Sequence, residues 1–302
     1  MGEEATAPRL NLPMKVAIIG GAGRMGSWFA RYFKAKGFPT ILSDVRDEET
    51  HVVAQAIGAE LADTNLDAVE CADMALVCVP IKKTREVILE VAPNMKRGAI
   101  LTEISSIKSL TMDALRRTTS MGIRPLSLHP MFGPVTGCLK GKTIVVVPVT
   151  DGGVEYSITK RMFEEAEITV ADSEEHDRAM AVAISLTYFM NLALAQVLRG
   201  ADLISLKGLA GTTFTVQLAI VESVVAEDPS LVESLLKENS FTELYVDRFI
   251  SEAETLRELI KGETKNFNEL YNFLKASLGR DPDYLRAEER RYKVFKALRA
   301  SG

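Results

Sequence analysis

The chain has 302 residues, of which 47% are hydrophobic and 25% are charged, a composition typical of a soluble globular protein with about two domains. A formal net charge of −5 and an isoelectric point near 5.5 argue against a nucleic-acid or anionic-membrane partner. No window approaches 18 uninterrupted apolar residues, so we expect a cytoplasmic protein without a membrane span. Residues 1–13 contain acids and no apolar core, which predicts a loose tail rather than a secretory signal.

Residues 14–170 alternate between apolar runs and amphipathic segments. Each apolar run is short and nearly continuous, as in strands that are buried on both faces of a parallel sheet. This alternation predicts a Rossmann-type nucleotide-binding domain. The predicted strands cover residues 16–19, 39–44, 72–80, 98–105, 123–128, 142–149 and 167–172, and the predicted helices between them cover residues 24–36, 48–59, 84–95, 109–117 and 155–166.

Residues 171–302 show only helical periodicity, which predicts an all-helical C-terminal domain. A segment from His176 to about Leu206 is too apolar for a solvated helix, so we expect it to be buried between helices or between subunits. The three cysteines, Cys71, Cys78 and Cys138, are scattered and odd in number. We interpret them as inert reduced thiols and predict no metal site.

A glycine-rich stretch follows the first predicted strand. The residues "GAGRMG" place Gly21, Gly23 and Gly26 in the G-x-G-x-x-G pattern between a strand and a helix. In that setting Gly21 permits the tight turn, Gly23 lets a pyrophosphate approach the backbone, and Gly26 lets helix and strand pack closely. The phosphates then meet the amino end of the helix at Arg24 and Met25, which predicts a bound dinucleotide.

Asp44 lies 18 residues beyond Gly26, at the end of the second predicted strand. A carboxylate there accepts hydrogen bonds from the adenosine ribose and repels a 2′-phosphate, which favours NAD over NADP. Arg24 and Arg46 are near enough in sequence to pair with a 2′-phosphate, so NADP stays possible.

Ligands of an open α/β sheet bind outside the carboxyl ends of its strands. Val79 and Pro80 end one predicted strand, and we expect them beside the cofactor. Ser105, Ser106 and Lys108 follow another strand, and His129 follows a third, so we expect these four near the nicotinamide. A neutral imidazole there can take a proton from a substrate hydroxyl while hydride leaves the same carbon. The alternative is a histidine that only fixes a turn.

The stretches "SLHPMFGP", "SSIK" and "EEHDRAM", together with the glycine loop, resemble the prephenate dehydrogenase family over nearly the whole chain. The resemblance implies NAD(P)-dependent oxidation of prephenate at C4, with loss of CO2, to 4-hydroxyphenylpyruvate in tyrosine biosynthesis. It implies that His129 accepts the hydroxyl proton, that Ser106 orients hydroxyl and imidazole, and that Ser105 lies near the cofactor. It places His176 and Asp177 near the cleft or the dimer contact, and implies a homodimer formed by the C-terminal helices.

The sequence departs from the family pattern at two positions. Ser223 stands where the family usually has an arginine that binds a substrate carboxylate, and Tyr188 stands where it tends to have a histidine. Prephenate is a dianion, so a cation should meet it. We keep Tyr188, His176 and Lys108 as candidate substrate contacts. The candidates for a displaced cation are Lys108, Arg178, Lys207 and Arg248.

Three alternatives to prephenate oxidation stay open. A paralogous dehydrogenase acting on a related substrate would explain the lost positive charge. A β-hydroxyacid dehydrogenase would share the domain plan, but its paired lysine and asparagine are represented here only by Asn191, with Thr187 in place of the lysine. A non-catalytic dinucleotide-binding homologue would tolerate the missing arginine, although Ser106 and His129 would then have no evident role.

Overall fold

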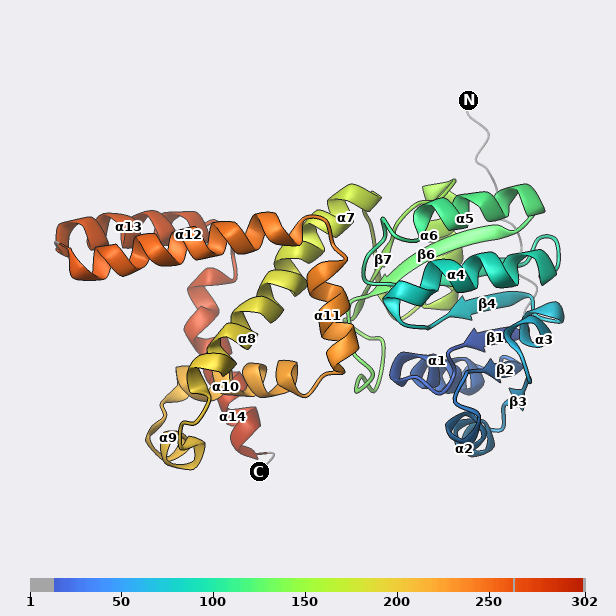
Figure 1. The fold of residues 1–302 in the computed structure, drawn as a ribbon, viewed down its shortest axis with the longest axis horizontal. Helices are drawn as coiled ribbons and strands as arrows, with labels where there is room; N and C mark the ends of the chain where they lie inside the picture. The colour runs from blue at the N-terminus through green and yellow to red at the C-terminus, as the bar shows by residue number, and fades with distance from the viewer. Residues whose placement is uncertain (1–13, 263, 301–302) are drawn as a thin grey trace. The chain divides into compact units, whose positions relative to one another are not determined.

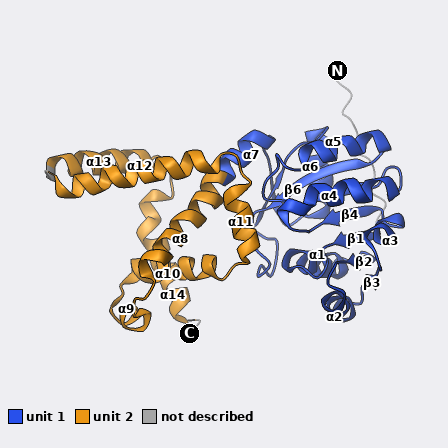
Figure 2. Cartoon of the chain, in the orientation of Figure 1, with its two compact units in different colours: residues 1–180 blue, residues 181–302 orange. Residues whose placement is uncertain are grey.

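The computed structural model describes residues 14–262 and 264–300 and divides into two compact units, residues 1–180 and 181–302 (Figure 2). The expected N-terminal tail, residues 1–13, lies outside the described residues.

Unit 1 is built on one eight-stranded sheet with the order β3-β2-β1-β4-β5-β6-β7-β8 (Figure 1). The pairing is parallel throughout except between β6 and β7, which run antiparallel. The strands are β1 (Val16–Ile19), β2 (Thr40–Ser43), β3 (Glu60–Leu61), β4 (Met74–Val77), β5 (Ile100–Glu103), β6 (Arg124–Pro130), β7 (Thr143–Val146) and β8 (Glu167–Val170).

One pair of strands departs from the predicted parallel arrangement, since β7 runs antiparallel to β6. A parallel return needs a long crossover connection, usually a helix. Residues 131–142 between β6 and β7 contain no helix, so β7 turns back beside β6.

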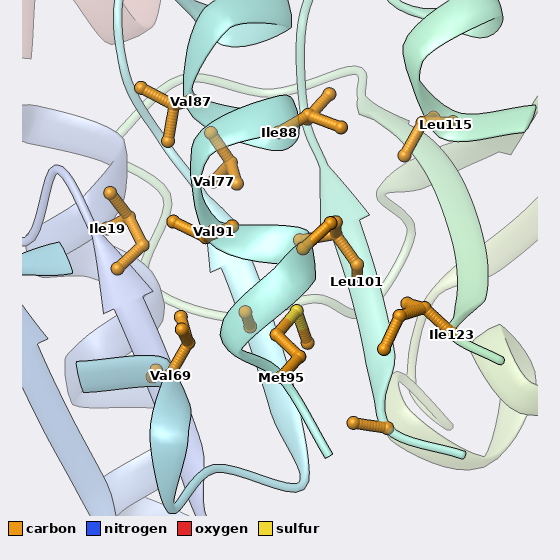
Figure 3. Packing of buried hydrophobic residues seen from close by; sticks show 14 of the residues in the cluster. Ile19, Val69, Val77, Val87, Ile88, Val91, Met95, Leu101, Leu115 and Ile123 are labelled. Atoms are coloured by element: carbon orange, nitrogen blue, oxygen red, sulfur yellow. The ribbon is translucent and has the colours of Figure 1, made fainter. Parts of the chain in front are cut away.

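Helices cover both faces of this sheet, which is why its central strands read as continuous apolar runs. Every residue of β1, β2, β4 and β5 is buried. Alternate residues enter two separate cores: Ile19 and Val77 pack with Val87 and Ile88 of one helix (Figure 3), while Ile18 packs on the opposite face. The helices of unit 1 are α1 (Arg24–Ala35), α2 (Asp47–Ile57), α3 (Asn65–Glu70), α4 (Ile81–Val91), α5 (Met112–Thr118), α6 (Gly152–Met162) and α7 (Ser173–Met180).

Two short elements, β3 and α3, were not predicted, because β3 has two exposed residues and α3 spans less than two turns. Helix α6 also starts and ends earlier than predicted. The Asp151 side chain accepts hydrogen bonds from the backbone N–H groups of Gly153 and Val154, which fixes the start of the helix.

Unit 2 is helical throughout its described residues, as the sequence predicts. A π-helical turn, Ala181–Leu186, leads into α8. Helix α10 packs against α8 and α14. The α-helices are α8 (Thr187–Leu198), α9 (Leu203–Leu209), α10 (Thr212–Val225), α11 (Pro229–Lys237), α12 (Thr242–Lys261), α13 (Thr264–Leu278) and α14 (Ala287–Ala300).

The helix that runs from Ser173 to Leu198 is long and apolar enough to cross a membrane, judged by length and composition alone, and no other helix in the described ranges passes that test. A single such helix is weak evidence, because apolar helices of soluble proteins share these properties. Only 17% of its most apolar window is buried within the chain.

Candidate functional site

The register of the sheet brings the predicted site residues of unit 1 to one edge. Ile19, at the end of β1, pairs with Val77 of β4. Val77 pairs in turn with Glu103 of β5, and Glu103 with Ser127 of β6. The segments that follow these four strands therefore all leave the sheet at its carboxyl edge, where ligands of such sheets bind.

The glycine loop connects β1 to α1 at this edge. Gly20 has the positive φ, +84°, and a Cβ there would lie 2.5 Å from the carbonyl oxygen of Cys78. The tight turn therefore depends on Gly20, and not on Gly21 as predicted. A Cβ on Gly21 would instead crowd Leu42, at 3.1 Å. A Cβ on Gly26 would lie 2.0 Å from the Gly20 carbonyl oxygen, so only glycine fits where α1 meets the turn.

The amino end of α1 fits a dinucleotide phosphate. Gly23 is the residue before the helix, and no side chain caps it. The first N–H groups of a helix lack intrahelical partners and carry a partial positive charge. The side chain of Arg24 is exposed, and Met25 is half-buried against the core, so both lie where the pattern places them.

Asp44 follows β2 and is connected to the glycine loop. Its Oδ2 accepts the backbone N–H of Ala22 at 3.0 Å. The Arg46 side chain donates to both carboxylate oxygens, from Nε at 3.1 Å and from Nη2 at 2.9 Å. The carboxylate is nearly buried while the guanidinium is half-exposed, so Arg46 is the group that can move toward a ligand.

Val79 and Pro80 follow β4 on the opposite side of the glycine loop. Val79 is half-buried, and one of its methyl groups would lie 3.2 Å from a Cβ on Gly20. Pro80 is exposed and precedes the first residue of α4. Both residues therefore border the turn that the dinucleotide motif forms.

His129 lies near the end of β6 and is almost completely buried. Its Nδ1 is 2.8 Å from Nε2 of His176, a residue of α7 that lies 47 positions later in the chain. In the part of the chain that the structure describes, no group hydrogen-bonds to Nε2 of His129. In that part of the chain, the fully buried side-chain polar atoms without a hydrogen-bond partner are Thr102 Oγ1 and Thr242 Oγ1. Nε2 of His129 is not one of them, so it is not fully buried. One ring nitrogen is thus engaged, and the other keeps contact with solvent.

His176 is bound in turn to Asp177. Nδ1 of His176 lies 2.8 Å from Oδ1 of Asp177. The same carboxylate accepts the backbone N–H groups of Lys108 and Ser109, each at 2.8 Å. Although burial raises the pKa of Asp177, the hydrogen bonds from His176 and these two N–H groups hold it below its usual 3.8, so Asp177 is ionised.

Lys108 is completely buried, which corrects the expectation of a solvated lysine able to meet a substrate carboxylate. Its ammonium donates to Oε1 of Glu103 at 2.8 Å and to the carbonyl oxygen of Leu128. Burial lowers the pKa of Lys108, against the opposing effect of Glu103. The lysine charge is therefore used inside unit 1, directly behind the strand that carries His129.

The two serines have different surroundings. Ser105 is buried: its backbone N–H donates to Glu103, and its hydroxyl donates to the carbonyl oxygen of Ile107. Its side chain therefore shapes the turn after β5. Ser106 is half-exposed and forms no hydrogen bond with another described residue, which leaves its hydroxyl available to a ligand.

The pKa of His129 is held well below 6.5. Burial is the largest cause, followed by the nearby Lys108 ammonium and by His176, with Asp177 acting in the opposite direction. His129 is consequently a neutral imidazole at neutral pH, as a proton acceptor must be.

The remaining predicted residues are in other surroundings. Tyr188 is half-exposed on α8, and the exposed Ser223 of α10 donates its hydroxyl to the Ile220 carbonyl oxygen at 2.8 Å. Two candidate cations are in exposed ion pairs, Arg178 with Glu174 and Lys207 with Glu222. Arg248 is exposed on α12.

Asn191, the one residue that matches the β-hydroxyacid dehydrogenase pattern, has a structural role in this protein. Asn191 is buried, donates to the Thr187 carbonyl oxygen at 2.8 Å and accepts from Gln217 at 2.7 Å. Its amide is occupied in joining α8 to α10.

Sequence reasoning missed Glu103 and the bond between the two histidines. Glu103 lies in the predicted strand 98–105, and its signal was a carboxylate within an otherwise apolar strand. Its Oε1 also accepts the Ser127 hydroxyl, at 2.6 Å. Only the fold brings His176 to His129, since nothing in their spacing indicates contact.

These features define a nucleotide-binding α/β protein with an all-helical second domain. The chain belongs to the prephenate dehydrogenase family: residues 29–170 match the model described as "Prephenate dehydrogenase, nucleotide-binding domain", and residues 172–276 match "Prephenate dehydrogenase, dimerization domain".

Three curated relatives with different names are similar to this chain. The "Probable arogenate/prephenate dehydrogenase" of Methanocaldococcus jannaschii is 29% identical over 263 residues, covering 84% of this chain and 58% of that protein. The "T-protein" of Haemophilus influenzae is 27% identical, covering 75% and 56%. The "4-amino-4-deoxyprephenate dehydrogenase" of Streptomyces pristinaespiralis is 27% identical, covering 59% and 61%. The chain thus spans less than two thirds of each relative.

Solved structures agree with the fold. Prephenate dehydrogenase from A. aeolicus, in complex with hydroxyphenyl propionate and NAD+, gives a TM-score of 0.71 at 22% identity, over 88% of this chain and 96% of that one. Synechocystis arogenate dehydrogenase gives 0.68 at 20% identity, over 90% and 100%. At these identities the likeness concerns the fold alone.

Proposed function

We propose that this protein is an NAD(P)-dependent dehydrogenase that oxidises prephenate, or a closely related cyclohexadienol, with loss of CO2. The observation that carries the proposal is His129: a neutral imidazole at the carboxyl edge of the sheet, with one nitrogen engaged and the other reachable from solvent. Family membership and the carboxyl-edge location of the glycine loop support it.

The residues present fit a dinucleotide. Gly23 and the amino end of α1 would hold the pyrophosphate, and Asp44 would accept the ribose hydroxyls. NAD is the expected cofactor. Arg46 can pair with the 2′-phosphate of NADP, so NADP is the second candidate. A bound cofactor supplies the hydride acceptor.

The protein's own part in the reaction is to move one proton and orient one hydroxyl. His129 takes the proton of the C4 hydroxyl as hydride leaves C4, and Ser106 donates a hydrogen bond that orients that hydroxyl. The bond to the ring carboxylate breaks, CO2 departs, and its electron pair completes the aromatic ring of 4-hydroxyphenylpyruvate. The C4–O bond is kept: the C4 oxygen becomes a phenolate, which takes back the proton held by His129 to give the phenol.

The substrate test compares three substituted cyclohexadienes, two with a C4 hydroxyl and one with a C4 amine. Purified protein is mixed with NAD or NADP and with prephenate, arogenate or 4-amino-4-deoxyprephenate, and the absorbance of reduced nicotinamide is followed. Rapid reduction with prephenate supports the proposal. Ser223 and Tyr188 favour the second candidate, a related substrate of different charge, which predicts fastest reduction with one of the other two. Tight cofactor binding without reduction on any of them would indicate a non-catalytic homologue.

We also propose that the protein is a homodimer formed through residues 181–302. The match to a dimerization domain supports this, as does the apolar helix that is mostly uncovered within one chain. Light scattering after size-exclusion chromatography should give twice the chain mass of 33.1 kDa. A mass of one chain at micromolar concentration would contradict it.

A further inference from the structure

The contacts of His129 determine which of its nitrogens carries the proton. An ionised carboxylate can only accept hydrogen bonds, so the contact between Asp177 Oδ1 and His176 Nδ1 requires a proton on that nitrogen. A neutral His176 then has a bare Nε2, which can only accept. The contact between the two rings therefore requires a proton on Nδ1 of His129, and Nε2 of His129 is the unprotonated nitrogen.

We propose that Asp177 and His176 are positioning residues that hold His129 in this tautomer, so that Nε2 accepts the substrate proton. Nε2 is the same nitrogen that no described residue engages. Asp177 is itself fixed by the backbone N–H groups of Lys108 and Ser109, which follow β5. The role of Nε2 in turnover rests on the proposed function, whereas the tautomer does not.

The same chain of hydrogen bonds accommodates the positive charge that proton transfer creates. The substrate O–H bond breaks and an N–H bond forms at Nε2 of His129. The proton on Nδ1 can then pass to Nε2 of His176, which moves the charge next to the Asp177 carboxylate. Loss of CO2 leaves a phenolate at C4, which takes the proton back from Nε2 of His129, and the proton between the two rings returns to Nδ1 of His129 so that both rings regain their neutral forms. No oxidant beyond the proposed nicotinamide cofactor is needed.

Three charged or titratable groups act on His129: Lys108, His176 and Asp177. The Lys108 ammonium opposes a charge on His129 but is balanced by Glu103 of β5. His176 and Asp177 come from α7. Asp177 is thus the carboxylate that can stabilise an imidazolium here, and only through His176.

Histidine-selective 15N labelling tests the tautomer directly in the apoprotein. The chain has three histidines, and His51→Gln, on an exposed face of α2, identifies the third and serves as the control. At neutral pH we expect His129 to show a protonated, pyrrole-type Nδ1 and a bare, pyridine-type Nε2. The reverse pattern in the wild-type protein would overturn the proposal.

Two variants separate positioning from simple packing. In Asp177→Asn the amide nitrogen can take the position of Oδ1 and donate to His176 Nδ1, while the oxygen, at the position of Oδ2, still accepts from Ser109 and the Lys108 N–H loses its acceptor. Both rings should then reverse their tautomers, placing a proton on Nε2 of His129. In His176→Gln the new carbonyl oxygen can accept from His129 and the amide can donate to Asp177, so the original tautomer should persist. An unchanged His129 pattern in a folded Asp177→Leu protein, whose side chain can accept no hydrogen bond from His176, would contradict the proposal.

Kinetics connect the tautomer to turnover. Asp177→Asn should lower kcat about 100-fold or more, the scale of a lost general base, while the KM for NAD changes little. His176→Gln, which keeps the tautomer of His129 but cannot take up its proton, should retain more of kcat than His176→Leu, which offers no acceptor. Equal losses in Gln and Leu variants that both fold would indicate a purely structural histidine. If Asp177→Asn does not fold, the 15N spectrum of the wild-type protein and the comparison of His176→Gln with His176→Leu still test the proposal. If wild-type protein oxidises no dienol, the proposed function fails while the spectrum still decides the tautomer.

Discussion

The Lys108 ammonium lies 2.8 Å from the Glu103 carboxylate, and neither side chain has any exposed surface. The pair joins the end of β5 to β6, because the ammonium also binds the Leu128 carbonyl oxygen and Ser127 donates to the same carboxylate. A charged pair of this kind is stable only when both partners and their hydrogen bonds are complete. The backbone immediately before His129 is thereby held in place by charge as well as by the sheet.

Breaking this pair should destabilise the protein strongly. Lys108→Met removes one charge and leaves Glu103 buried without its partner, and we expect the free energy of unfolding to fall by about 3–5 kcal/mol. Denaturant unfolding measures it. The double variant Lys108→Met with Glu103→Gln, which removes both charges, should recover much of the loss. Lys83→Met, which removes an exposed pair with Glu86, should change little. An unfolding free energy equal to wild type in Lys108→Met would contradict this role.

Gly26→Ala should disrupt the glycine loop. The new methyl group would lie 2.0 Å from the Gly20 carbonyl oxygen, so the turn must open. We expect a lower melting temperature and NAD binding weakened at least about tenfold, because the phosphate site depends on this backbone. Gly137→Ala is the matched control, since no atom lies within 4 Å of its added Cβ. Tight NAD binding in Gly26→Ala would show that the phosphates bind elsewhere.

Asp44→Ala should weaken NAD binding and shift preference toward NADP. The substitution removes the ribose acceptor and releases Arg46, which now binds that carboxylate through two nitrogens. A freed guanidinium suits a 2′-phosphate. Isothermal titration with both cofactors measures the ratio of affinities. The gain in NADP should disappear in the double variant with Arg46→Ala; if it persists, Arg46 is not its cause.

His129→Asn should abolish proton transfer while leaving the cofactor site intact. We expect kcat to fall about 100-fold or more, with the dissociation constant of NAD little changed. Stopped-flow measurement of nicotinamide reduction isolates the chemical step. Wild-type turnover in this variant would make the imidazole structural.

Stability should fall as the pH drops below about 6.5, in part through His129. Its pKa is lowered in the folded protein by burial, by Lys108 and by His176, so between that lowered value and 6.5 the unfolded chain binds a proton that the native protein does not. The loss from this group should be at most about 1.4 kcal/mol per pH unit. His129→Asn should lose less stability over the same interval. For the same reason the acidic limit of kcat/KM should lie below pH 6.5, and a limit above it would argue against His129 as the base.

Much of the fold could be predicted because strands buried on both faces leave a clear apolar signal. The runs at Val16–Ile19 and Met74–Val77 are nearly unbroken, and each strand lies where the run predicts. Strand direction carries no such signal. Thr143–Val146 is mostly apolar, like the parallel strands β1 and β4, so its antiparallel pairing with β6 could not be read from composition.

The sheet edge at which the candidate site residues lie could be predicted, but the hydrogen bonds and ion pairs among them could not. Strand ends indicated the sheet edge that holds Ser106 and His129. Burial of Lys108 was not predictable, since a lysine in a polar segment after a strand is usually solvated. Its counter-charge, Glu103, had the apolar surroundings of a strand as its only signal. The tight turn fell on Gly20 rather than Gly21, because the motif specifies small residues without specifying dihedral angles.

The chain's single tryptophan, Trp28, lies on α1 one turn after the glycine loop begins the helix. Its indole N–H donates to the Thr136 carbonyl oxygen at 2.6 Å, and its ring stacks on Tyr32 and contacts Phe132. Ultraviolet-excited indole emission from this protein therefore originates at one place, between α1 and the segment that leaves β6. The intrinsic fluorescence of Trp28 can therefore be used, without a label, to follow cofactor binding and rearrangement of that segment in real time.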